Sequence, residues 1–142
     1  MTGAAGRPPF LDTNVLLYLL SADAAKADRA EALLHDGATV GVQVLNEFAS
    51  VASRKLSMPW AEIDDLLGLI RRRCEVRDLT LAVHERGLAL VREYRFAWYD
   101  ALIVTAALDA GCTVLYSEDM QHRMKVAGRL VIVNPFSARS GR

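Results

Sequence analysis

Short apolar runs alternate with longer amphipathic stretches along most of the chain. Between the short runs, apolar residues recur every three or four positions, which is the period of a helix with one buried face. The short runs have the length and composition of strands, and they lie at residues 10–11, 39–42, 75–77, 113–116 and 130–133. This alternation predicts an α/β fold with a mainly parallel sheet.

The pattern predicts six helices, at residues 15–20, 25–34, 45–56, 60–73, 81–94 and 99–108. In the third, an apolar stripe runs from Leu45 through Phe48 and Ala52 to Leu56; Glu47 lies off that stripe, and Pro59 is expected to close the helix. The last helix is apolar on nearly every side, so we expect it to be central. Gly111 should then adopt the left-handed backbone of a helix cap.

The size and composition of the chain fit one domain. With 142 residues, of which 52% are hydrophobic, it can bury a sizeable core as a single domain over residues 1–142, with flexible ends at 1–8 and 137–142. No stretch approaches the roughly 20 apolar residues of a membrane span, and the N-terminus lacks the apolar core of a signal peptide. We therefore expect a cytoplasmic protein without a membrane partner.

Charge and metal-binding residue types narrow the chemistry. The formal net charge is zero, which argues against a protein that coats nucleic acid by electrostatics alone. Cys74 and Cys112 stand apart and the three histidines are scattered, so a thiolate or imidazole metal site is disfavoured, and we expect the thiols to be buried. No glycine-rich phosphate loop is present.

Four carboxylates follow predicted strands or begin predicted helices. Asp12 ends the first strand, Glu47 begins the helix after the second, Asp100 begins the central helix, and Asp119 follows the strand at 113–116. Because the carboxyl ends of parallel strands share one edge of a sheet, where ligands bind, we expect these four side chains to converge.

Converging carboxylates cannot all remain ionised without a cation. We therefore expect at least one of them to have a raised pKa in the absence of metal. Oxygen ligands without His or Cys select Mg²⁺ or Mn²⁺ over zinc. Such an ion activates water and offsets charge on a phosphoryl oxygen, which makes phosphodiester hydrolysis the natural chemistry.

Each acid also has a structural explanation. Asp12, Asp100 and Asp119 suit helix N-caps or first turns, and Glu47 suits a helix dipole. Glu118 competes with Asp119 for the fourth position. Ser117 could bond an acid or a metal-bound water, or it could make an ordinary turn.

Two further groups of residues have open roles. Arg54 and Lys55, after Glu47, could contact phosphates, but a solvated helix end is the favoured interpretation. The aromatic residues Tyr18, Trp60 and Trp98 could stack on bases, but we expect them in the core.

Four segments together resemble the PIN-domain signature: Phe-Leu-Asp-Thr-Asn-Val-Leu at 10–16, Glu47 early in a helix, Tyr-Asp-Ala-Leu-Ile at 99–103, and Ser-Glu-Asp-Met at 117–120. In size and spacing the chain is similar to VapC-type toxins, the ribonucleases of bacterial toxin-antitoxin modules. The resemblance implies a three-layer α/β/α sandwich, Mg²⁺ or Mn²⁺, RNA cleavage, a homodimer, and inhibition by a small VapB-type antitoxin. It assigns Asp12, Glu47, Asp100 and Asp119 as catalytic, metal-binding acids, supported by Thr13, Asn14 and Ser117.

Other functions compete with a ribonuclease. A PIN-like module without catalysis could serve as a binding partner in an assembly, although such modules usually lose an acid. A haloacid-dehalogenase-like phosphatase would use Asp12 as its nucleophile but needs a second Asp two positions later, where this chain has Asn14. A receiver-like signalling domain would need an acidic pair at the first strand. The sequence favours the ribonuclease.

Overall fold

The computed structural model describes residues 7–137, so most of the two ends expected to be flexible lies outside the described residues. One sheet has the strand order β3-β2-β1-β4-β6-β5. Its strands are β1 (Phe10–Leu11), β2 (Ala38–Gly41), β3 (Cys74–Arg77), β4 (Val114–Tyr116), β5 (Lys125–Val126) and β6 (Leu130–Val133). All are parallel except β5, which pairs antiparallel with β6.

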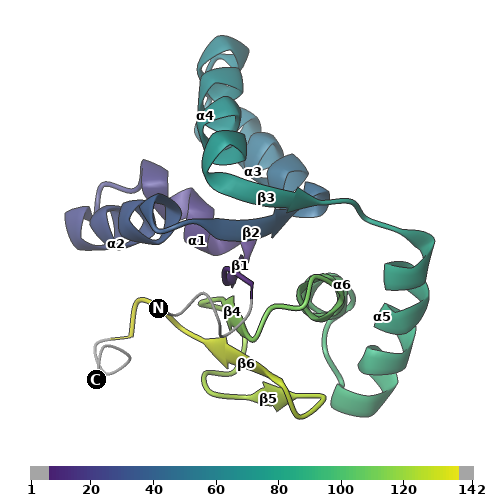
Figure 1. The fold of residues 1–142 in the computed structure, drawn as a ribbon. Coiled ribbons are helices and arrows are strands. Elements are labelled where there is room, and N and C mark those ends of the chain that lie inside the picture. Colours follow the sequence, from purple (N-terminus) through teal and green to yellow (C-terminus); the bar gives the residue numbers. More distant parts are fainter. Residues whose placement is uncertain (1–6, 138–142) are drawn as a thin grey trace.

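Helices cover the sheet and connect its parallel strands, except that β4 is followed by β5 and β6 without a helix between them. They are α1 (Thr13–Leu17), the 3₁₀ turn η2 (Tyr18–Leu20), α2 (Ala24–His35), α3 (Val42–Arg54), α4 (Trp60–Arg73), α5 (Leu81–Tyr94) and α6 (Trp98–Asp109). In Figure 1, α1 and α6 lie on opposite sides of β1, and α5 packs outside α6. The expected three-layer α/β/α sandwich is confirmed.

The shortest parallel strand is at the centre of the sheet. Phe10 and Leu11 of β1 are fully buried between β2 and β4. The predicted central helix is α6. Seven of its residues are buried, and they are not confined to one face of the helix. Gly111, just beyond it, has a φ of +79°, as expected for a left-handed cap.

Both predicted ends of the third helix were wrong, and α3 begins at Val42, three positions before Leu45. Helix α3 ends at Arg54, and Leu56, expected on its buried stripe, lies outside it with 48% of its surface exposed. Lys55 is the C-cap of α3, and Ser57, with a left-handed φ of +54°, keeps the chain beyond Leu56 out of the helical conformation. Pro59 does not close α3 but forms the N-cap of α4.

The sequence pattern also missed β5. This two-residue strand turns back into β6 through Ala127 and Gly128, both with positive φ. Asn or Gly usually marks the first position of such a hairpin turn, and alanine at that position gives no signal. The missed strand extends the sheet at the edge farthest from β3.

The expectation that the thiols are buried was met in full for one of the two cysteines. Cys112 is buried and Cys74 is half-buried; burial raises the pKa of both thiols, that of Cys74 to about 11. Within residues 7–137, no helix combines the length and apolarity that crossing a membrane requires.

Candidate active site

Asp12 lies at the carboxyl end of β1, directly before α1. Its Oδ1 accepts a hydrogen bond from the Thr13 backbone N–H at 2.7 Å, and its Oδ2 accepts one from Ser117 Oγ at 2.7 Å. Asp12 is therefore the N-cap of α1, as its structural explanation required. Ser117 bonds an acid, which decides between the roles that its sequence position left open.

Burial dominates the electrostatics of Asp12. The side chain is 6% exposed, and desolvation raises its pKa to about 6, although the hydrogen bonds from Ser117 and Thr13 oppose the shift. The negative charges of Asp100 and Asp119 raise it further. The expectation of at least one raised pKa in the acidic cluster is confirmed.

Glu47 reaches the same region from α3. It lies in the second turn of that helix and not at its start, because α3 already begins at Val42. The hydroxyl of Thr13 donates a hydrogen bond to Glu47 Oε1. Thr13 thus contacts two acids, Asp12 through its backbone and Glu47 through its side chain.

Asp100 and Asp119 complete the cluster. Burial raises the pKa of Asp100, and the charges of Asp119 and Glu47 raise it further, so these acids lie close enough to influence one another. Within residues 7–137, no hydrogen bond or ion pair holds either the Asp100 or the Asp119 side chain. Asp100 lies in the first turn of α6, as its structural explanation required, whereas Asp119 precedes no helix, so capping does not explain Asp119.

Glu118 belongs to a different set of contacts from Asp119. Its carboxylate accepts hydrogen bonds from Tyr18 Oη at 2.5 Å and from Lys26 Nζ at 2.9 Å. Burial alone would raise the pKa of Glu118, but these two bonds and the Lys26 charge lower it. The Glu118 backbone N–H donates to Asn14 Oδ1 at 3.2 Å, which ties the segment to α1.

Whether the acidic cluster suits a metal ion depends on the type of its ligand atoms. Among the described residues, no three acidic, His or Cys side chains already converge as a ready metal-binding group. Mg²⁺, however, keeps several waters and is held by one or two carboxylates together with substrate phosphates. An all-carboxylate set in which burial, together with mutual repulsion, raises two pKa values fits such a hydrated cation.

A mainly apolar cleft adjoins the cluster. Its volume is about 410 Å³, and its lining residues are Asn14, Leu17, Tyr18, Leu20, Ser21, Val51, Leu56, Glu118 and Asp119. The sequence analysis did not single out Lys26, because nothing in the pattern around it indicates its contact with Glu118, which lies 92 positions away.

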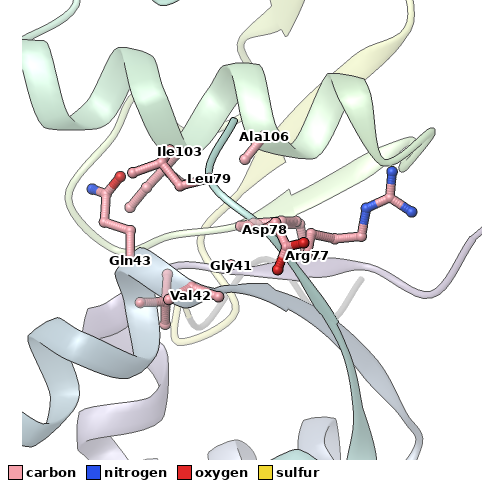
Figure 2. Close-up of a pocket in the computed structure, with 10 residues that line it drawn as sticks. Gly41, Val42, Gln43, Arg77, Asp78, Leu79, Ile103 and Ala106 are labelled. Atoms are coloured by element: carbon pink, nitrogen blue, oxygen red, sulfur yellow. The ribbon is translucent and has the colours of Figure 1, made fainter. Parts of the chain in front are cut away.

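A second, smaller cavity lies where β2 and β3 end. Figure 2 shows Gln43 rising from the start of α3 beside Ile103, with Arg77 and Asp78 across the cavity. The volume of about 10 Å³ has room for about one water molecule. Gln43 Nε2 is buried there without a hydrogen-bond partner in the described part of the chain. Gln43 precedes Glu47 by one helical turn and shares its face of α3.

None of the three aromatic residues that were expected in the core is fully buried. Trp60 is 64% exposed at the start of α4 and does not fill the core. Trp98 is half-buried against His84, and Tyr18 packs edge-on against Phe136. Arg54 and Lys55 are exposed at the end of α3, in agreement with a solvated helix end.

The fold has counterparts among solved structures. A toxin-antitoxin complex from Klebsiella pneumoniae matches with 20% identity and a TM-score of 0.67, over 90% of this chain and 98% of that one. VapC20 of Mycobacterium tuberculosis, a sarcin-ricin loop cleaving toxin, matches with 21% identity and a TM-score of 0.62, over 78% and 88%. VapBC2 of Rickettsia felis, bound to a DNA fragment from its promoter, matches with 18% identity and a TM-score of 0.64, over 87% and 95%. At these identities the likeness shows a shared fold.

A comparison with curated proteins found no match. The model of the PIN domain family matches residues 10–127, which include all four acids of the cluster. The chain therefore belongs to the PIN domain family.

Proposed function

We propose that this protein is a Mg²⁺- or Mn²⁺-dependent endoribonuclease that acts as the toxin of a toxin-antitoxin pair. One observation carries the proposal: within a PIN fold, Asp12, Glu47, Asp100 and Asp119 come from separate elements, and burial together with the charges of neighbouring acids raises the pKa of Asp12 and Asp100. A repulsive cluster of this kind is costly unless a cation is bound.

The chain's own residues would hold and orient the cation. Asp12 is fixed by Thr13 and Ser117 and keeps free lone pairs on both oxygens, whereas Glu47 is oriented by the Thr13 hydroxyl. Asp100 and Asp119 have no competing partner among the described residues and can turn toward an ion. When bound, a divalent cation would supply an activated water and offset charge on the phosphate.

The structural neighbours also support a protein partner for this chain. The Klebsiella neighbour is a toxin-antitoxin complex and the Rickettsia neighbour a VapBC pair, which supports a small VapB-type antitoxin as the partner of this chain. RNA as substrate is supported by the VapC20 neighbour, a toxin that cleaves the sarcin-ricin loop. A homodimer belongs to the same proposal.

Cleavage of cellular RNA tests the function directly. Total RNA is incubated with purified protein in Mg²⁺, Mn²⁺ or chelator, and the new RNA ends are mapped. We expect defined ends with metal only, and rates below about 1% of wild type for Asp12→Asn and Asp100→Asn, since both changes remove metal-binding charge.

Asp65→Asn is the matched control, because it removes an equal charge from the exposed surface of α4 and should cleave as wild type does. Metal-dependent cleavage that survives both Asp12→Asn and Asp100→Asn would contradict the assignment. Metal binding without turnover on any RNA would instead identify a non-catalytic PIN module.

A further inference from the structure

Three side chains tie the segment that carries Asp119 to the first helices of the chain. Lys26 Nζ lies 2.9 Å from Glu118 Oε2 and 3.0 Å from Tyr18 Oη, and Tyr18 Oη donates to Glu118 Oε1. We call these residues the Lys26 cluster. It joins η2 and α2, which follow each other in the chain, to the segment after β4, which is remote from both in sequence.

The Lys26 ammonium is held on several sides. It lies 4.4 Å from the centroid of the Tyr18 ring, and that ring packs edge-on against Phe136 at 4.6 Å. The side chains of Lys26 and Glu118 are only 32% and 26% exposed. Both features favour one fixed geometry over the mobile pairing typical of surface ions.

Asp119 depends on this geometry for its position. Its own side chain makes no hydrogen bond within residues 7–137, so its place is set by the chain on either side. On the N-terminal side, Ser117 N–H donates to the Val133 carbonyl at 3.0 Å and Glu118 N–H donates to Asn14 at 3.2 Å. Glu118, held at both its backbone and its side chain, is the residue directly before Asp119.

We propose that Lys26 and Tyr18 are positioning residues: through Glu118 they fix the segment that presents Asp119 to the acidic cluster, and so set its affinity for a divalent cation. The inference rests on the proposed function only in placing Asp119 at the metal site. A direct role of Lys26 on an RNA phosphate is the competing explanation.

Mn²⁺ binding, measured by calorimetry on the whole protein, tests the proposal without RNA. We expect Lys26→Met to bind Mn²⁺ about tenfold more weakly, as for other residues that orient metal ligands. Glu118→Gln should weaken binding in the same direction. Lys26→Arg, which keeps a cation able to bond the carboxylate, should recover affinity to within about threefold of wild type.

Arg86→Met is the matched control. Arg86 forms a comparable ion pair with Asp109, at 3.3 Å, at the opposite end of α6 from Asp100, and its loss should leave Mn²⁺ affinity unchanged. The melting temperatures of all these variants should stay within about 4 °C of wild type, because partly exposed ion pairs contribute little to folding. Equal Mn²⁺ affinity in wild type and Lys26→Met would overturn the proposal.

Amide hydrogen exchange in the metal-free protein provides a second readout. The Glu118 amide should exchange faster in Lys26→Met and in Tyr18→Phe, and at the wild-type rate in Arg86→Met. If wild type bound no Mn²⁺ or cleaved no RNA, the proposed function would fail, and this measurement alone would decide the role of the Lys26 cluster: unchanged exchange overturns it.

RNA kinetics separate positioning from phosphate contact. Positioning predicts a lower kcat that excess Mn²⁺ restores, with an unchanged KM for RNA. If Lys26 contacted a phosphate instead, Lys26→Met would raise KM and reduce its salt dependence. Glu118→Gln would then free Lys26 and tighten RNA binding, a result that would overturn the proposal.

Discussion

Asp12 combines two properties that oppose each other in the absence of a cation. It is almost fully buried, which disfavours its charge, and both its oxygens accept hydrogen bonds, which favour that charge. Burial is the larger influence, so the pKa of Asp12 rises from its ordinary 3.8 to about 6. A cation is therefore expected to act on stability as well as on catalysis.

The pH dependence of stability follows from this shift. The folded protein holds the Asp12 proton more tightly than the unfolded chain, so this contribution to stability is complete below about pH 4 and is lost as the pH rises through about 6. At pH 8 the buried charge costs on the order of 2–3 kcal/mol. Asparagine cannot ionise, so metal-free Asp12→Asn should be more stable than wild type at pH 8 and nearly equal to it at pH 4.

Urea unfolding in chelator at the two pH values measures this difference, and Asp65→Asn should show none. Mg²⁺ should raise the stability of wild type at pH 8 and leave Asp12→Asn nearly unchanged, because metal binding to the folded state stabilises it by linkage. If Asp12→Asn were less stable than wild type at pH 8, the hydrogen bonds from Thr13 and Ser117 would outweigh the cost of burial.

At the scale of elements, hydrophobic periodicity predicted the bounds of a helix or strand correctly where that element has one clearly buried face. The helices at 60–73 and 81–94 and the strand at 130–133 begin and end as the pattern predicts. The end of α3 and strand β5 were missed because Ser57 and Ala127 take left-handed backbones that their residue types do not signal. Local sequence carries little information about such strain.

The candidate site shows a different limit. Motif spacing predicts Asp12, Glu47, Asp100 and Asp119 as the site acids, but the sequence alone does not say which of the adjacent acids Glu118 and Asp119 belongs to the site. Only the tertiary position of Lys26 distinguishes them, by pairing with Glu118. Tyr18 was expected in the core because its local sequence does not indicate its contacts with Lys26 and Glu118.

The pairing of α5 with α6 depends on one glycine. A Cβ added at Gly87 would lie 3.0 Å from Leu102 Cδ2 and 3.7 Å from both Thr105 Oγ1 and Trp98. Gly87→Val should therefore push the helices apart and lower the free energy of unfolding by about 1–3 kcal/mol.

Gly68 in α4 is the matched control for Gly87, since a Cβ there would meet only the flexible ends of Arg71 and Arg72. Gly68→Ala should raise stability by about 0.5–1 kcal/mol through helix propensity. Urea unfolding measures both changes, and a neutral Gly87→Val would show that α5 can shift without loss.

For the whole molecule, β1 is the element that joins the two halves of the sheet. Phe10 pairs with Thr39 of β2 on one side and with Leu115 of β4 on the other, and it is fully buried. Phe10→Ala should lower the free energy of unfolding by about 3–5 kcal/mol.

Because the cavity left by Phe10→Ala would touch both halves, the protein should still unfold in one transition. Far-ultraviolet circular dichroism and the fluorescence of half-buried Trp98 would then coincide. Leu79→Ala, at a residue 51% exposed, should change stability by no more than about 0.5 kcal/mol. Two separate transitions in Phe10→Ala would mean that the halves fold independently.

The hydrogen bond between Ser117 and Asp12 spans 105 positions, and this has a consequence during synthesis. A growing polypeptide contains Asp12 and Glu47 long before it contains Asp100 and Asp119, and β1 has no neighbour on one side until β4 has been made. A nascent chain therefore cannot assemble the acidic cluster while it is still short. An acidic cluster of this design stays incomplete until the segment after β4, which carries Asp119, has been synthesised.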